Sequence, residues 1–251
     1  MTSARIIVLA TLAALGVSCR SGPPPAIDPV LAERVPAAAT VLGGADLERV
    51  RSSHLYQELP PAARAFLETL SGAHSVLVAS DGGNLLVLTR GDFKKAPPGA
   101  TLLGQGLAAA GSPDWVRAAA SRHVGDRNGL LAHAEPLAAM ADMWMVAAGS
   151  ANLPFTGNGE NAGRLLHATE YATLTARLTD RVSLAIVGMC RGPDSARRVE
   201  ETVRSYATLG AAGEARQPAV SGLLRRIQVS RDGSAVRVTL VARADELKAF
   251  F

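Results

Sequence analysis

SVLVASDGGNLLVLT, residues 75–89, decides the fold class of this 251-residue chain. Two apolar runs, Ser75 to Ala79 and Leu85 to Thr89, flank the polar stretch Ser80-Asp81-Gly82-Gly83-Asn84. Glycine adopts a positive φ without steric cost, and a short glycine-containing turn between apolar runs is typical of a β-hairpin. The stretch therefore predicts an antiparallel pair of strands in the first half of the chain.

A second pair of strands is predicted in the second half. Tyr171 to Leu178 alternates with a period of two, which marks a half-buried strand. Thr179-Asp180-Arg181 joins it to the apolar run Val182 to Met189, so the two runs pair naturally as a hairpin. Ile227 to Ser230 and Ala235 to Ala242, on either side of an Arg-Asp-Gly-Ser turn, predict a third pair.

Helical segments separate these strands. The segment Asp194 to Leu209 places Ala196, Val199 and Val203 on one face, and Gly210 follows where a helix would stop. Further helices are predicted at residues 47–55, 61–70, 113–122, 130–140 and 244–251. Antiparallel strand pairs with helices packed on one face give an α+β fold class.

The chain divides into two predicted lobes. Ser150 to Gly163 is dense in Asn, Gly, Pro and Ser and has no apolar period, as expected of a connection between lobes. We therefore expect a first α+β lobe at residues 37–150, a connecting loop at 151–163 and a second α+β lobe at 164–251. No residue-level repeat decides whether the two lobes are a duplicated unit.

The N-terminus has the pattern of an export signal. Ile6 to Val17 is an apolar run of about a dozen residues, too short for a membrane-spanning helix, which needs roughly 20. Residues 1–18 are therefore predicted to be a signal peptide. The small residues before Cys19 resemble the lipobox of bacterial lipoproteins, although Gly16 stands where that motif prefers Leu. An ordinary secretory signal peptide is the alternative.

The lipoprotein resemblance implies a location in the cell envelope. It implies that Cys19 is diacylated, so that the membrane is a partner through an N-terminal lipid anchor. Residues 19–36 are rich in Pro, Ser and Gly and predict an extended tether. Because Arg20 stands where the inner-membrane retention signal has Asp, we expect the periplasmic leaflet of the outer membrane. Without lipidation, the protein would be secreted.

The charge balance argues against a nucleic-acid partner. The 26 Lys and Arg residues against 22 Asp and Glu residues give a net charge of +4. The arginines are spread along the chain, and the pairs Arg197-Arg198 and Arg225-Arg226 are not interleaved with aromatic residues. We expect a solvated basic face and no bound nucleic acid.

The sequence holds no residue pattern typical of catalysis or metal binding. Its five histidines include no pair spaced by two or four residues, and no cysteine or acidic cluster completes a zinc site. Gly43-Gly44 lacks the third glycine of a dinucleotide-binding turn. Cys190 has no activating base beside it in sequence, so a buried, unreactive thiol is predicted. We predict no catalytic residue, no metal site and no cofactor.

Two tryptophans suggest different roles. Trp144 lies in the apolar run Met143 to Ala148 and is predicted to be core. Trp115 lies in the first turn of a helix between Asp114 and Arg117, which suggests a partly exposed position. If the protein has a binding surface, Trp115 is the candidate anchor.

Five stretches carry a resemblance to a known family: Val35 to Ala38, Leu47 to Ser53, Val76 to Thr89, Met143 to Ala148 and Ile227 to Leu247. Together they resemble an uncharacterised family of exported two-lobed proteins common in Acidobacteria-type genomes. The resemblance implies a two-lobed α+β fold and an envelope location. It carries over no catalytic residue, because it rests on core strands, turns and a helix start.

Three functions remain open at this point. The first is a lipid-anchored envelope protein that binds or scaffolds an envelope protein partner without catalysis. The second is a binding module that holds a small molecule or peptide in a cleft between the lobes, because clefts commonly form at domain interfaces. The third is an enzyme whose residues converge only in the folded chain. The absence of a catalytic pattern favours the first.

Overall fold

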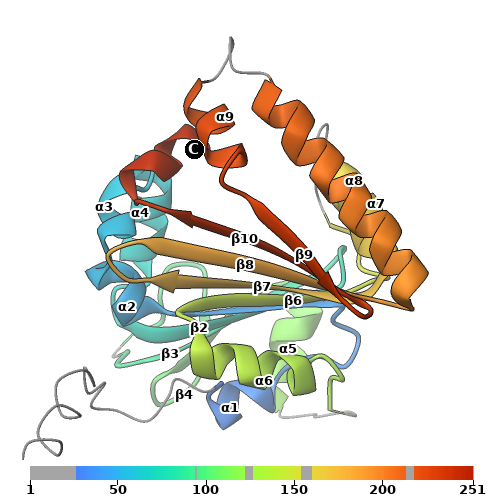
Figure 1. Ribbon diagram of the computed structural model, residues 1–251. Helices are drawn as coiled ribbons and strands as arrows, with labels where there is room; N and C mark the ends of the chain where they lie inside the picture. The colour runs from blue at the N-terminus through green and yellow to red at the C-terminus, as the bar shows by residue number, and fades with distance from the viewer. Residues whose placement is uncertain (1–26, 94, 122–126, 154–159, 213–217, 251) are drawn as a thin grey trace, which may run out of the picture.

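The computed structural model describes residues 27–93, 95–121, 127–153, 160–212 and 218–250. Within them, ten strands form one antiparallel sheet in the order β4-β5-β3-β2-β1-β6-β7-β8-β10-β9 (Figure 1). The strands are β1 Val41–Asp46, β2 Ala73–Ser80, β3 Leu85–Gly91, β4 Thr101–Gly104, β5 Leu107–Gly111, β6 Met143–Ala148, β7 Thr169–Leu178, β8 Val182–Cys190, β9 Gln228–Asp232 and β10 Ala235–Ala242. The α+β fold class is confirmed.

The hairpin at residues 75–89 is confirmed as β2 and β3, which pair in register. Its turn is held by the Asp81 carboxylate, which accepts hydrogen bonds from the backbone N–H groups of Gly83 at 2.9 Å and Asn84 at 2.6 Å. Gly82 adopts a φ of 95°, a conformation that residues with a Cβ rarely adopt. The local sequence therefore determines this turn.

The structure does not show two lobes. Strand β6, assigned to the first lobe, pairs with β7 of the second over six residue pairs, from Met143 and Ala176 to Ala148 and Tyr171. The His133 ring of helix α6 also stacks on the Tyr171 ring, with centroids 3.9 Å apart. The polar connection at residues 151–163 thus joins, in sequence, two neighbouring strands of one continuous sheet.

A buried carboxylate ties the two halves of the sheet together. Asp142, just before β6, accepts hydrogen bonds from the Leu178 N–H at 2.7 Å and from the Arg49 guanidinium at 3.1 Å. Its own backbone carbonyl accepts from the Asp46 N–H at 2.9 Å. Asp142 therefore links β1 and helix α2 on one side to β7 on the other.

One face of the sheet, called the core face below, carries the main hydrophobic core. Helices α1 (Pro29–Ala32), α5 (Pro113–Ser121) and α6 (Leu131–Met140) lie below the sheet in Figure 1. They pack on strand residues that include Leu42, Leu77, Leu86, Leu88, Trp144 and Val146. Each such Leu or Val, fully buried, contributes roughly 1.5 to 3 kcal/mol through removal of apolar surface from water.

Part of the predicted tether belongs to this core. Of residues 19–36, the structure describes 27–36, in which Leu31 and Val35 are buried against the core face. Asp28 caps α1 by accepting from the Val30 N–H at 2.8 Å, and Pro29 occupies the first helical position. The predicted solvated tether therefore does not reach residue 36, because Leu31 and Val35 follow the prolines and pack into the core.

Helices also cover the opposite face, in contrast to the prediction of helices on one face only. Toward one end lie α2 (Leu47–Ser52), α3 (His54–Glu58), α4 (Pro61–Thr69) and a 3₁₀ helix at Asp245–Phe250, which contacts α3. Toward the other end lie α7 (Glu160–His167) and α8 (Pro193–Ala212), and α9 (Pro218–Leu224) lies between the 3₁₀ helix and α8, in contact with both. They form four small hydrophobic clusters on this face. None of the helices in the described ranges is both long and apolar enough to cross a bilayer.

Candidate ligand-binding site

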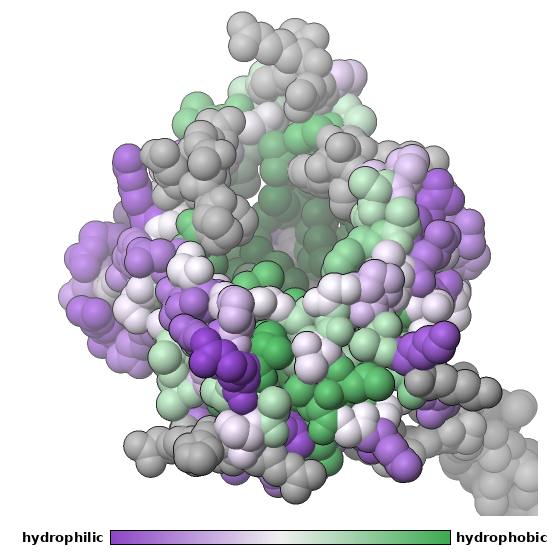
Figure 2. Space-filling model, turned by 180° about the vertical axis from the view of Figure 1, so that it is seen from behind, coloured by the Kyte–Doolittle hydropathy of each residue, from purple (hydrophilic) through white to green (hydrophobic). Residues whose placement is uncertain are grey.

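An apolar cavity of about 400 Å³ lies between the sheet and helices α7 and α8. It is on the face opposite the main core, which is called the trough face below. Figure 2, seen from behind, shows a hollow whose floor is hydrophobic. No charged residue is among the described residues that line the cavity, and the polar Thr169 hydroxyl is satisfied by the Leu166 carbonyl at 2.7 Å. The cavity has the volume and the apolar lining of a small-molecule site.

The floor of the cavity is a row of large apolar side chains that face one another across four strands. Met145, Leu174, Ile186 and Val238 are paired in register on β6, β7, β8 and β10. None of the four is buried, and Ile186 is 43% exposed. We call this row and the cavity above it the trough. A row of partly exposed apolar side chains under an apolar cavity is typical of a ligand-binding site.

The residues beside this row allow helix α7 to approach closely. The next row across the same four strands consists of Ala147, Ala172, Gly188 and Val236, and Leu166 of α7 packs against the two alanines. Small side chains let the helix come near the sheet at this end, while the large side chains of the floor row remain uncovered. Both rows line the cavity, which extends from the small residues near α7 to the large side chains of the floor row.

Helix α8 contacts the sheet over only part of its length. Ala196 and Val199, near its N-terminal end, are buried, whereas Tyr206 and Leu209, farther along, are exposed. At its C-terminal end α8 packs on α9 instead, and a Cβ at Gly210 would lie 2.5 Å from the Leu224 side chain. The close contact with α9 holds α8 away from the floor row and leaves the trough open.

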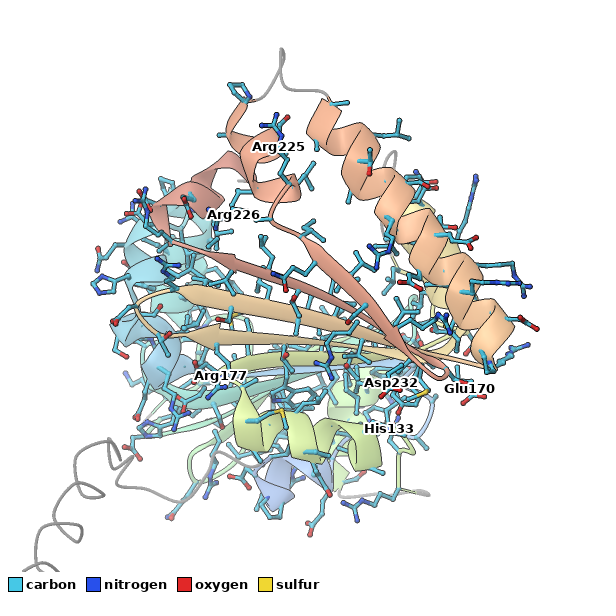
Figure 3. All side chains as sticks on the ribbon, viewed as in Figure 1. His133, Glu170, Arg177, Arg225, Arg226 and Asp232 are labelled. Atoms are coloured by element: carbon cyan, nitrogen blue, oxygen red, sulfur yellow. The ribbon has the colours of Figure 1, made fainter. Side chains whose placement is uncertain are left out.

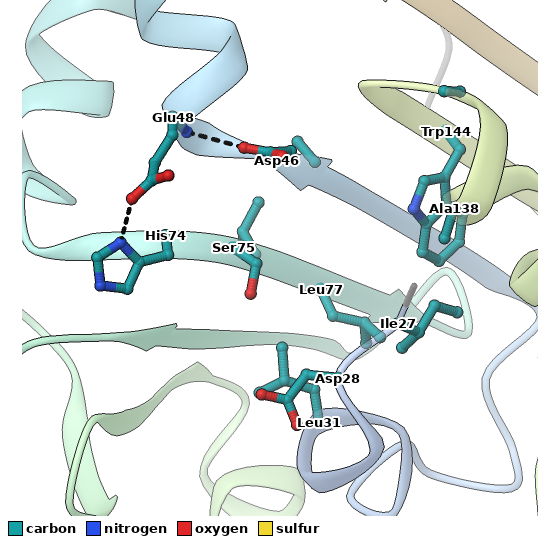
Figure 4. Close-up of a pocket in the computed structure, with 13 residues that line it drawn as sticks. Ile27, Asp28, Leu31, Asp46, Glu48, His74, Ser75, Leu77, Ala138 and Trp144 are labelled. Carbon is teal, nitrogen blue, oxygen red and sulfur yellow. Dashed lines mark hydrogen bonds and ion pairs between the residues drawn. The ribbon is translucent and has the colours of Figure 1, made fainter. Parts of the chain in front are cut away.

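A smaller cavity of about 230 Å³ lies at the edge of the core face (Figure 4). His74, about half exposed, places Nδ1 2.6 Å from a Glu48 carboxylate oxygen and Nε2 3.1 Å from an Asp92 carboxylate oxygen. The hydrogen bond to Glu48, followed by that to Asp92, raises the pKa of His74 above its ordinary value. Because both ring nitrogens are occupied by carboxylates, His74 serves as an ion-pair centre rather than as a base for a neighbouring hydroxyl.

The described residues provide no metal site and no activated cysteine. No group of three His, Cys, Asp or Glu side chains among them could hold a metal ion. Cys190 is buried, as predicted, and desolvation, with a smaller contribution from the charge of Glu170, raises the pKa of its thiol. A thiol in this state is a poor nucleophile.

The predicted site residues have different outcomes. Cys19 lies outside the described residues, so its lipidation stays a prediction. Trp115 of α5 is partly buried against the core-face cluster and lines neither cavity described above, so its role as a binding anchor also stays a prediction. Trp144 is buried in the core, which confirms its predicted position.

The trough was not predicted from the sequence. The alternation of Tyr171 to Leu178 correctly predicted a half-buried strand, but periodicity does not tell whether a helix closes the apolar face of that strand or leaves it open. The available signal was the contrast between the apolar strand residues and the few apolar positions on the long charged helix α8.

Comparisons with known proteins show the fold alone. No family model and no curated protein matches the chain. Crystal form III of TP0453 superimposes with a TM-score of 0.53 at 8% sequence identity, covering 87% of this chain and 96% of that chain. Crystal form I gives a TM-score of 0.50 at 10% identity, covering 88% and 96%. The fold therefore resembles that of TP0453, and the predicted family of exported proteins stays a prediction.

Proposed function

We propose that this protein is an exported, lipid-anchored envelope protein that binds an apolar ligand in the trough without catalysis. The observation that carries the proposal is the floor row, in which four large apolar side chains in register lie under an apolar cavity of about 400 Å³. Binding would remove these side chains from water, and each Å² of apolar surface buried in this way stabilises the complex by roughly 25 cal/mol. The ligand would therefore lie between the sheet and helices α7 and α8, and not in a cleft between two lobes.

The location rests on the N-terminal sequence. The signal peptide at residues 1–18 and the lipobox-like residues before Cys19 support an anchor in the periplasmic leaflet of the outer membrane. An anchored binding protein would hold its trough within reach of apolar molecules of the envelope. Intact mass of the membrane-fractionated protein tests the anchor, since an unmodified Cys19 would contradict it.

Binding of the neutral apolar dye Nile red tests the trough. Ile186 on the floor and Val241 on the other face of the same sheet are exposed to 43% and 45%, so they form a matched pair. Ile186→Trp adds a large side chain to the trough and should weaken dye binding at least about 10-fold, equivalent to about 1.4 kcal/mol. Val241→Trp adds the same side chain on the far face and should leave binding unchanged.

Two results would contradict the proposal. Equal loss of binding in both variants would show that the dye reports general exposure of apolar surface. Absence of saturable binding to the wild-type protein, together with a dimer in solution that Ile186→Trp disrupts, would show that a second copy of the chain covers the trough instead.

A further inference from the structure

A third cavity, of about 560 Å³, lies in the groove between helices α7 and α8. It is lined by polar and cationic side chains, among them Arg164 and His167 of α7, Arg198 of α8 and Arg191 just before α8. We call it the cationic groove. It brings together four basic side chains from three separate segments of the chain.

The arginines of the groove differ from their neighbours on α8. Arg197 pairs with Asp194 at 3.5 Å, and Arg204 pairs with Glu200 at 2.9 Å. In contrast, the Arg164, Arg191 and Arg198 guanidinium groups form no ion pair with any carboxylate of the described residues. Three cations without an acidic partner in one groove repel each other, and an anion between them would remove this repulsion.

The remaining polar groups fit an anionic ligand. The His167 Nδ1 lies 2.6 Å from the Gly149 carbonyl oxygen, which only accepts, so Nδ1 carries the hydrogen. This leaves Nε2 free for a further hydrogen bond. Arginine side chains bind carboxylate and phosphate oxygens through two N–H groups at once.

The cationic groove and the trough adjoin each other. Leu165 of α7 and Val199 of α8 line both cavities, so side chains of these two helices form the partition between them. A ligand with a chain in the trough could therefore carry a headgroup that reaches the groove at the α7–α8 contact, if these two side chains shift.

We propose that the ligand is an amphiphile with one long alkyl chain and an anionic headgroup. The chain occupies the trough, and the carboxylate or phosphate of the headgroup is held by Arg164, Arg191 and Arg198. This inference rests on the proposed function and adds the class of ligand. A neutral apolar ligand would fill the trough but leave the three arginines uncompensated.

Displacement of Nile red by ligands of matched chain length tests the headgroup. We expect palmitate and hexadecyl phosphate to displace the dye at concentrations about 10-fold lower than hexadecan-1-ol, which has the same chain without the charge. Each of R164Q, R191Q and R198Q should weaken the anionic ligands about 2- to 5-fold, as expected for exposed charge pairs, and the triple variant should abolish their advantage. Displacement by the alcohol should not change.

Arg177 offers a matched control. It is also exposed and without a carboxylate partner in the described part of the chain, but its strand position places it on the core face, away from the groove (Figure 3). R177Q removes the same charge and should change no displacement curve. A preference of palmitate over hexadecyl phosphate, or the reverse, identifies the source of the anion and supports the inference in either case.

Three outcomes overturn the inference while leaving the proposed function intact. The first is equal displacement by the alcohol and the anionic ligands, and the second is an unchanged advantage in the triple variant. The third is calorimetric binding of inorganic phosphate as tight as that of hexadecyl phosphate, which would make the groove an anion site independent of the trough. Failure of Nile red to bind the wild-type protein would instead overturn the proposed function itself.

Discussion

The two faces of the sheet are built from the same strands but are closed to different degrees. On the core face, Leu86 and Leu88 of β3 and Val146 of β6 are fully buried. On the trough face, Met143 of β6 and Ile186 of β8 remain exposed. Strand β6 takes part in both, so the difference arises from the helices that pack on each face.

The composition of the covering helices explains the contrast. Helix α6, with the sequence LAHAEPLAAM, is mostly apolar and contacts the sheet through the small residues Ala134 and Ala138, which allow close packing. Helix α8 is 20 residues long and carries its charged residues between Asp194 and Arg204, with buried apolar residues only at Ala196 and Val199. Because the buried apolar face of α8 is narrow, the helix covers only part of the sheet, and the floor row of the trough stays available to a ligand.

Leucine truncation on each face should give the largest effect. Leu88→Ala creates a cavity in a closed core and should lower the free energy of unfolding by about 3 to 5 kcal/mol. Leu174→Ala on the trough floor, which is only partly buried, should cost about 1 kcal/mol in the absence of ligand, because its surroundings are already open. Urea denaturation measures both. Equal losses would show that the trough is packed as tightly as the core face.

Removal of the buried carboxylate between the halves should have the next largest effect. Asp142→Ala leaves the Leu178 N–H and the Arg49 guanidinium without their acceptor and should cost about 2 to 3 kcal/mol. Because both faces belong to one sheet, unfolding should remain a single transition by near-UV and far-UV circular dichroism. Two separated transitions in the variant would restore the interpretation of two independent lobes.

The smallest effect concerns the cavity at the edge of the core face. The pKa of His74 is raised by Glu48 and Asp92, so the folded state holds the proton more tightly than the unfolded chain. The stabilisation is present below the ordinary pKa of 6.5 and is lost as the pH rises through the raised pKa of the folded state.

His74→Gln should therefore lower stability near pH 5 by less than about 1 kcal/mol, since the site is exposed and screened by solvent. The difference from wild type should disappear by about pH 9. His54→Gln removes another exposed histidine, one without an ion pair in the described residues, and serves as the control. A loss that is the same at both pH values would point to packing and not to charge.

Several local features followed from the sequence because short-range chemistry determines them. A helix was predicted to begin at Leu47, and Asp46 caps it through a carboxylate that accepts from the Glu48 N–H at 3.1 Å and the Arg49 N–H at 3.0 Å. The hairpins β2–β3 and β7–β8 were predicted from turns and periodicity. In the candidate site, the strands that form the floor could be predicted, but their exposure could not.

The sequence by itself determined the hairpins and the α+β class, since a hairpin depends on residues a few positions apart. The predicted stop of α8 at Gly210 is wrong, because the helix continues to Ala212 and Gly210 packs against Leu224 of α9. Only the tertiary structure placed β1 between β2 and β6 and paired β6 with β7, because such pairings depend on which distant strands offer matching surfaces. It also brought Arg164, Arg191 and Arg198 to one groove beside an open apolar floor. Three arginines spread over 35 positions carry no local pattern, so their meeting is a property of how α7 and α8 pack on the sheet.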